Sequence, residues 1–230
     1  MIHQFIFAAP KPGLSADAFT SYWINLHAVD YTAKIKQIRQ YLVAARLQVA
    51  TGRDLPADYQ GVAEIWLKDD AEQIASMQSP EFLQGARLDE PRWAAFWLTF
   101  VLNTEAQVLT GDQNPMPAPE RAKLYVLLKR KPTLALADFR AQLIADRGDL
   151  GKRCGLTRHL VAFSRDGTYG VGEPPFDAVE VIALPDRAAL DALLADANFA
   201  GALTRRAYVH DTYAFNFIAQ EHWIIRPGER

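Results

Sequence analysis

The stretch Phe19-Thr20-Ser21-Tyr22-Trp23-Ile24-Asn25-Leu26-His27 decides how the first part of this chain folds. Five of its side chains lie at i, i+3, i+4, i+7 and i+8 and predict one stripe of an amphipathic helix: Phe19, Tyr22, Trp23, Leu26 and His27. Ser15 is a good N-cap, and the carboxylate of Asp17 suits the first turn of a helix. We therefore expect a helix from about Ser15 to Leu26 whose aromatic face ends in a histidine.

The histidine at the end of this stripe is the candidate catalytic residue. Proton transfer near neutral pH needs a group whose pKa is close to the working pH, and histidine is the usual choice. His27 would serve as this group, and Asp30, three residues on, would orient its ring if the helix continues. The alternative is a core histidine that makes one hydrogen bond and takes no part in chemistry.

The composition excludes several classes of protein. The chain has 230 residues, of which half are hydrophobic and 23% charged, as is ordinary for a globular protein. A net charge of −2 gives no basic footprint for nucleic acid, and the single Cys154 excludes an intrachain disulfide. The N-terminus lacks the basic region of a signal peptide, and the most apolar run, Trp93 to Leu102, is too short to span a membrane. We expect a cytoplasmic protein.

The strand and helix signals occur twice in the same order. Lys11-Pro12 matches Lys131-Pro132 and Phe19 matches Phe139 at an offset of 120 (139 − 19). Glu64 matches Glu180 at an offset of 116 (180 − 64). The segment 111–119 has the Gly and Pro content of a linker. We therefore predict an N-terminal domain over 1–110 and a C-terminal domain over 120–230.

Each copy is predicted to have the order β-α-β-β-α-β, which is the ferredoxin-like arrangement. Such a unit has a four-stranded antiparallel sheet with both helices on one face, so the other face must be covered. A second copy can cover it. We therefore expect an α+β fold of two tandem units packed sheet to sheet, or closed into a barrel, within one chain.

The chain resembles the EthD-like proteins of the dimeric α+β barrel superfamily. The resemblance rests on several motifs: Lys11-Pro12-Gly13-Leu14-Ser15, Phe19, Tyr22-Trp23, His27, Arg39-Gln40-Tyr41 and Tyr59-Gln60-Gly61-Val62-Ala63-Glu64-Ile65-Trp66. It covers residues 1–110 well and is weaker over 120–226. The chain departs from the family after His27, where members often carry a proline and this chain has Ala28.

The resemblance implies a small α+β barrel with a cavity between sheet and helices, and a chain that is a fused dimer. Related proteins include cofactor-independent monooxygenases, cyclases, decarboxylases, dehydratases and isomerases, and many have no assigned activity. The expected partner is a small apolar, aromatic or polyketide-like molecule, with no nucleic acid and no membrane. A homodimer of the fused chain stays open.

The other candidates are substrate-binding residues. Trp23 and Tyr22 would form an aromatic wall, the phenols of Tyr41 and Tyr59 would hydrogen-bond a substrate oxygen, and Phe7 would line the pocket if its face of the strand points inward. Glu64 and Glu180 would meet in one interior, or would instead point outward or pair with Arg or Lys. Half-buried structural positions are the alternative for the tyrosines.

The second copy has lost the catalytic pattern. At the offset of 120, Arg147 replaces His27 (147 − 27), and an arginine cannot act as a base near pH 7. We therefore expect one working site, in the N-terminal copy, in an acid/base enzyme of the lyase, dehydratase, decarboxylase, cyclase or isomerase type without metal or cofactor. The alternatives are a non-catalytic binder of the same ligands and, less favoured, a haem-binding α+β barrel protein.

Overall fold

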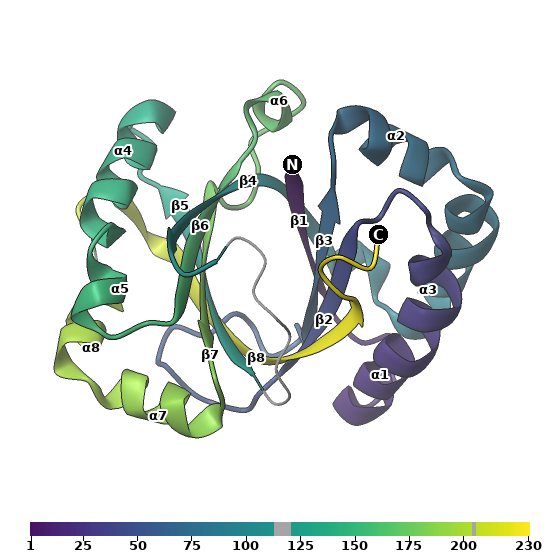
Figure 1. Cartoon of the computed structure of the whole chain (residues 1–230), viewed down its shortest axis with the longest axis horizontal. Coiled ribbons are helices and arrows are strands. Elements are labelled where there is room, and N and C mark those ends of the chain that lie inside the picture. The colour runs from purple at the N-terminus through teal and green to yellow at the C-terminus, as the bar shows by residue number, and fades with distance from the viewer. Residues whose placement is uncertain (113–120, 204–205) are drawn as a thin grey trace. The chain divides into compact units, whose positions relative to one another are not determined.

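The computed structural model describes residues 1–112, 121–203 and 206–230, so residues 113–119 of the predicted linker lie outside the described residues. The strands of the described part are β1 (Ile2–Ala8), β2 (Gln40–Arg46), β3 (Gly61–Leu67), β4 (Phe100–Thr110), β5 (Ala122–Arg130), β6 (Arg158–Ser164), β7 (Ala178–Leu184) and β8 (Val209–Ile225). They are hydrogen-bonded in the order β1-β3-β2-β8-β5-β7-β6-β4 (Figure 1). The fold is a mixed α+β fold with a closed antiparallel barrel of these strands.

Contacts divide the chain into two compact units. The first contains Met1–Arg46, Pro56–Asn103 and Glu221–Arg230, and the second contains Leu47–Leu55 and Thr104–Gln220. Strands β4 and β8 therefore each begin in one unit and end in the other. The division into domains at 1–110 and 120–230 stays a prediction.

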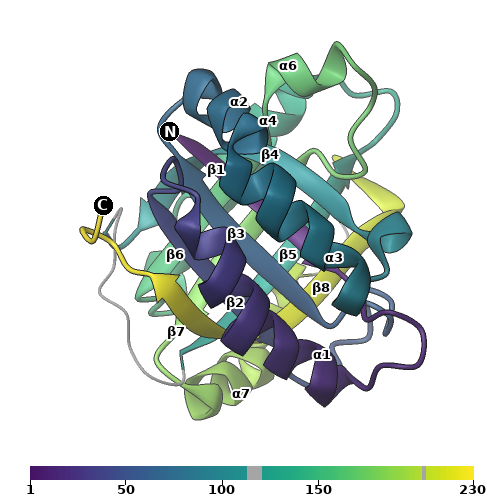
Figure 2. The ribbon, with the colours of Figure 1, turned by 90° about the vertical axis from the view of Figure 1, so that its right-hand side faces the viewer.

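The helical segments of the first unit cover one face of strands β1, β2 and β3 (Figure 2). They are α1 (Ala16–Tyr22), η1 (Trp23–Tyr31), η2 (Thr32–Lys34), α2 (Asp70–Gln78), η3 (Glu81–Ala86), α3 (Arg87–Trp93) and η4 (Phe96–Leu98). The predicted N-cap of α1 is confirmed, because the Ser15 hydroxyl accepts a hydrogen bond from the Ala18 N–H at 3.2 Å. The helix does not end at Leu26 as predicted. It continues without a break into η1, which is π-helical, a winding that is frequent at functional sites.

The pairing of β1 with β3 decides which side chains of the first unit face its helices. Gln4 lies opposite Ile65, and Phe5 lies opposite Glu64. Because side chains alternate between the two faces of a strand, Gln4, Ile65 and their even-spaced neighbours face the helices, whereas Phe5 and Glu64 face away. Figure 1 shows these helices on one side of the three strands.

The helix-facing core of the first unit is aromatic. The buried Phe19 ring lies 5.4 Å from the Trp23 ring and 5.3 Å from the Trp93 ring, and the two indoles are 4.9 Å apart, between ring centroids. Trp23 also lies directly over β3. A Cβ atom at Gly61 would come within 2.7 Å of Trp23 Cζ3, so only glycine admits the indole at this point. The predicted aromatic stripe is therefore the core of this unit.

The second unit has the strand order β8-β5-β7-β6-β4, with its helices packed against β5, β6 and β7. The helices are α4 (Leu136–Arg147), α5 (Leu150–Arg153), α6 (Asp166–Tyr169), α7 (Arg187–Ala195) and α8 (Ala197–Leu203). Phe139 is fully buried, as is Phe19 in the first unit. The short α6 follows β6 directly along the chain. None of the helices in the described part of the chain has the length and apolar character that crossing a membrane requires.

The proposed equivalence of Glu64 and Glu180 is wrong at the level of the strands. Strand β7 begins 117 residues after β3 (178 − 61) and also ends 117 residues after it (184 − 67), whereas the two glutamates are 116 apart. A shift by one residue moves a side chain to the other face of a strand. Glu180 therefore faces the helices of its unit, where it contacts Arg147 of α4, and Glu64 faces away from the helices of its own.

Candidate functional site

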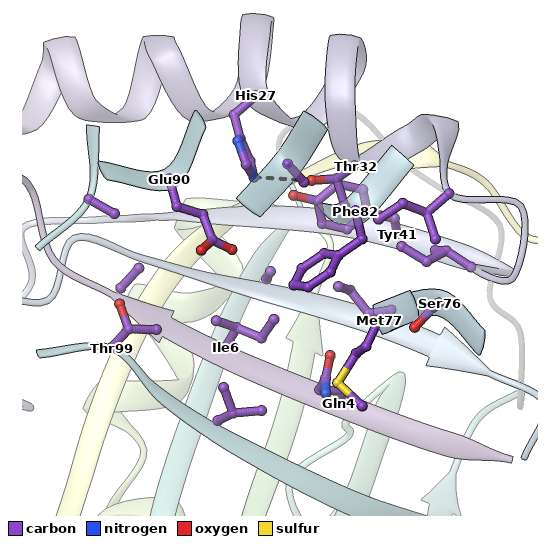
Figure 3. A pocket seen from close by; sticks show the side chains of 18 of the residues that line it. Gln4, Ile6, His27, Thr32, Tyr41, Ser76, Met77, Phe82, Glu90 and Thr99 are labelled. Atoms are coloured by element: carbon purple, nitrogen blue, oxygen red, sulfur yellow. Dashed lines mark hydrogen bonds between the residues drawn. The ribbon is translucent and has the colours of Figure 1, made fainter. Parts of the chain in front are cut away.

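A cavity of about 440 Å³ lies in the first unit, between its helical segments and the helix-facing side of β1, β2 and β3 (Figure 3). This volume is in the range of sites for small organic molecules. Most of its wall is apolar, including Ile6, Ile65, Phe82 and Trp93. The polar side chains on the wall are Gln4, His27, Thr32, Tyr41, Gln73, Ser76, Glu90, Thr99 and Asn103.

His27 is held on both sides by hydrogen bonds. Its Nδ1 lies 2.9 Å from Oδ2 of Asp89, and its Nε2 lies 3.1 Å from the Thr32 hydroxyl. Both His27 and Asp89 are buried. An ionised carboxylate only accepts hydrogen bonds, so Nδ1 carries the proton, and Nε2 is the basic nitrogen that receives the Thr32 O–H.

The environment keeps this imidazole neutral near pH 7. Burial lowers the pKa of His27 below its ordinary value of about 6.5, and the hydrogen bond and charge of Asp89 oppose this effect only in part. Asp89 is itself held by the Tyr22 hydroxyl, which donates to Oδ1 at 2.8 Å. The result is a neutral histidine with a fixed tautomer and a basic nitrogen at the cavity wall.

Further polar groups lie beside Thr32 on the wall. The Tyr41 phenol interacts electrostatically with Thr32, and the indole N–H of Trp23 donates to the phenol oxygen at 3.2 Å. Burial raises the pKa of Tyr41, so the phenol keeps its proton at neutral pH. Trp23, Tyr41, Thr32 and His27 therefore form one connected polar strip in a wall that is otherwise apolar.

Glu90 is a second titratable group that reaches into the same cavity (Figure 3). Burial raises the pKa of its carboxyl, and the Arg87 guanidinium, whose Nη1 is 2.7 Å from Oε2, opposes this effect. Arg87 lies outside the cavity lining and stacks its guanidinium over Phe96, 4.5 Å from the ring centroid. No three His, Cys, Asp or Glu side chains in the described part of the chain gather as a metal site.

Amide side chains form a third polar group on the wall. Asn103 Oδ1 accepts two hydrogen bonds of 2.8 Å, one from Gln4 Nε2 and one from Gln73 Nε2. These three residues come from β4, β1 and α2, and all are half-buried. In Figure 3 Gln4 lies across the cavity from His27 and Thr32.

The structure brings three of the predicted site residues together. His27, Trp23 and Tyr41 all line the cavity and belong to the polar strip. Tyr22 does not line it. Its hydroxyl donates a hydrogen bond to Asp89 Oδ1 and so helps to hold the carboxylate that contacts His27.

The other predicted binding residues lie outside this cavity. Phe7 stacks on Phe100, with ring centroids 4.9 Å apart, and Glu64 pairs with His3 at 2.7 Å, both on the strand face away from the helices. Tyr59 donates its hydroxyl to the backbone oxygen of Leu98 at 2.9 Å. For Phe7 and Glu64 the pairing of β1 with β3 decides the face, whereas Tyr59 lies before β3 begins.

Three functional candidates were missed by the sequence reasoning: Thr32, Asp89 and Glu90. Asp30 was the expected partner of His27, but it is exposed, and Asp89 takes this place from 62 residues further along the chain. A weak signal was present, because Asp89 and Glu90 stand side by side in a helix that also carries Trp93. Nothing in their spacing connects them with His27.

The second unit has an ion cluster where the first has its histidine. Arg147 Nε lies 2.9 Å from Glu180 Oε1. The same oxygen is hydrogen-bonded to His159 Nε2 at 2.8 Å. All three side chains are buried. Burial acts to raise the pKa of Glu180, but the charge of Arg147 and the His159 contact outweigh it and hold that pKa below its usual range. The cluster is thus an ionised structural pair, with Arg147 unable to act as a base.

Replacing Asp89 with asparagine is expected to lower the pKa of His27 further below its ordinary value. The Asp89 carboxylate raises this pKa against the effect of burial, so without it the titration of the imidazole shifts to lower pH. Asparagine also carries no charge that could stabilise the imidazolium. An NMR titration of the His27 ring between pH 4 and 8 measures the shift.

Asp30→Asn is the matched control for this variant, since it changes another aspartate of the same unit that is exposed. It should leave the titration of His27 unchanged. An identical titration of His27 in the wild type and in Asp89→Asn would show that Asp89 does not raise the pKa of this histidine.

An α+β barrel with a cavity between its sheet and helices is the fold of the dimeric α+β barrel proteins. An anthrone oxidase-like protein has this fold with a TM-score of 0.65 and 10% identity, over 98% of this chain and 94% of that chain. A candidate monooxygenase from Fusobacterium nucleatum subsp. nucleatum ATCC 25586 has a TM-score of 0.63 and 8% identity, over 97% and 92%. At these identities the likeness shows the fold alone. No curated protein is significantly similar in sequence.

A family model matches the N-terminal part of the chain. The EthD domain matches residues 11–96, which confirms the resemblance that the motifs around His27 indicated. A solved EthD family protein from Bacillus halodurans C-125 is 21% identical over 46% of this chain and 98% of its own, with a TM-score of 0.38. The match contains His27, Thr32, Tyr41, Asp89 and Glu90.

Proposed function

We propose that this protein is an acid/base enzyme that removes a proton from carbon in a small, largely apolar molecule, with His27 as the base. The observation that carries the proposal is the position of His27 on the cavity wall, neutral, with Nδ1 fixed by Asp89. A carboxylate behind an imidazole orients the ring and stabilises the cation that forms when the other nitrogen takes a proton. Dehydratase, cyclase and isomerase reactions, and other lyase reactions that begin with C–H cleavage, share such a proton-transfer step, whereas a decarboxylation does not.

The proton path follows from the contacts of His27. At rest, the Thr32 hydroxyl donates to Nε2. When a ligand is bound, the Thr32 side chain rotates away from His27, so that the lone pair of Nε2 faces the substrate C–H and takes its proton. The electron pair of the broken C–H bond moves onto a conjugated carbonyl oxygen of the substrate. Asp89 then stabilises the imidazolium.

The composition of the cavity wall favours an uncharged substrate. It is mostly apolar, and the described residues that line it include no lysine or arginine, whereas they include the carboxyl group of Glu90. A carboxylate or phosphate in this cavity would lose its hydration without gaining a counter-charge. A flat aromatic or polyketide-like ketone suits both the volume and the wall.

The haem alternative fits these residues less well. The same wall has no lysine or arginine among its described residues to pair with propionates. A non-catalytic binder remains the second candidate, because an apolar cavity suits binding as well as turnover.

We further infer that the chain arose as two fused β-α-β-β-α-β copies and that only the first copy keeps a functional site. The order of helices and strands supports this, as do the buried Phe19 and Phe139 near the start of the first helix of each copy. The replacement of a histidine by the ion-paired Arg147 supports the loss of function in the second copy.

Deuterium exchange tests the proposed proton abstraction without knowledge of the product. The probe is anthrone, chosen because the fold resembles an anthrone oxidase-like protein. Under anaerobic conditions in D₂O, the protein should accelerate exchange of the CH₂ protons of anthrone above the buffer rate, as followed by proton NMR. Binding of anthrone without faster exchange would favour the non-catalytic binder and overturn the proposed function.

A further inference from the structure

We propose that the amide cluster of Gln4, Gln73 and Asn103 is a substrate subsite that receives a carbonyl oxygen of a neutral ligand, with the Asn103 amide N–H as donor. The inference rests on the proposed function in naming the substrate, an uncharged ketone whose acidic C–H faces His27. It adds a residue that determines which ligands enter and how they lie.

The hydrogen bonds of the cluster leave a donor free at the wall. Asn103 Oδ1 accepts from both glutamine amides, so the three side chains are locked in orientation. An asparagine amide has two N–H donors. Within the described residues, Nδ2 of Asn103 makes no hydrogen bond, although the side chain is half-buried and lines the cavity.

The surroundings of this free donor favour one class of ligand group. Most of the cavity wall is apolar, so a carbonyl oxygen that enters the cavity leaves water and gains from a donor in the protein. The amide is neutral, which suits a carbonyl or hydroxyl oxygen better than an anion. Gln4 lies across the cavity from His27 (Figure 3), so a ligand that fills the cavity meets the base at one side and the amides at the other.

A purely structural role is the competing explanation, because the cluster also ties β1, α2 and β4 together. The variant Asn103→Asp distinguishes the ligand-binding explanation from the structural one. The aspartate keeps an oxygen that accepts from Gln4 and Gln73, but it replaces the free N–H donor with a second acceptor. Asn103→Leu removes the donor without adding a charge, and serves as the second variant.

Equilibrium dialysis under anaerobic conditions tests the subsite with anthrone and 9,10-dihydroanthracene, which has the same three rings and no carbonyl. The wild type should bind anthrone about 3- to 10-fold more tightly, the size of one net hydrogen bond. In both Asn103 variants this preference should disappear, while the Kd of 9,10-dihydroanthracene stays within about twofold and reports an intact cavity. Anthracene-9-carboxylate should bind the wild type more weakly than anthrone.

The outcomes separate the subsite from the proposed function. Equal affinity of the wild type for the two neutral probes, equal weakening of both probes in the variants, or no measurable binding would overturn the subsite. Exchange of anthrone that depends on His27 would then still support the enzyme. Conversely, a preference that depends on Asn103 without any exchange would support the subsite and leave the protein a binder.

Discussion

Replacing His27 with alanine is expected to lower the rate of anthrone exchange by about 10²–10⁴-fold, which is the usual contribution of a positioned acid or base. The other groups on the wall cannot replace it. Burial holds Tyr41 in its protonated form, and Glu90 is paired with Arg87. Single-turnover NMR of the exchange, together with the Kd of anthrone, separates lost chemistry from lost binding.

The expected Kd of the His27→Ala variant is close to that of the wild type, since the apolar wall is unchanged. His210→Ala is the control, because this histidine belongs to the second unit and does not line the cavity. Arg147→Ala should also leave exchange nearly intact under conditions where the variant is folded. Equal loss from His27→Ala and Arg147→Ala would mean that the site has been assigned to the wrong half of the chain.

Replacing Arg147 with methionine is expected to lower the free energy of unfolding by about 3–5 kcal/mol, the range for a buried ion pair that loses one partner. Glu180 is buried and ionised against Arg147, so removal of the guanidinium leaves a carboxylate without its counter-charge. His159 keeps one contact with Glu180, which sets the loss toward the lower end of this range. Urea denaturation at pH 7 measures the change.

The double variant Arg147→Met with Glu180→Gln should recover most of this loss, because no uncompensated charge remains and the glutamine oxygen still accepts from His159. Arg187→Met is the matched surface control. It breaks an exposed pair with Asp191 and should cost no more than about 0.5 kcal/mol. A double variant as unstable as Arg147→Met alone would exclude the buried charge as the cause.

The sequence was sufficient to predict the start and the buried face of the first helix, which depend on neighbours along the chain. The stripe from Phe19 to His27 and the Ser15 cap predicted α1, because helix spacing and capping act within a few residues. The sequence also indicated His27, Trp23 and Tyr41 as site residues, and all three line one cavity of the first unit. The motif around His27 also indicated the EthD family correctly.

Only the tertiary structure decided which side chains meet. The partner of His27 is Asp89 rather than the nearby Asp30, and Asn103 joins Gln4 from the opposite end of the first unit in sequence. The faces of Glu64 and Glu180 depended on strand pairing, in which an offset of one residue reverses the direction of a side chain. These contacts join residues that are tens of positions apart. The sequence pattern that predicts a helix or strand depends only on residues close together along the chain, so it does not indicate such pairs.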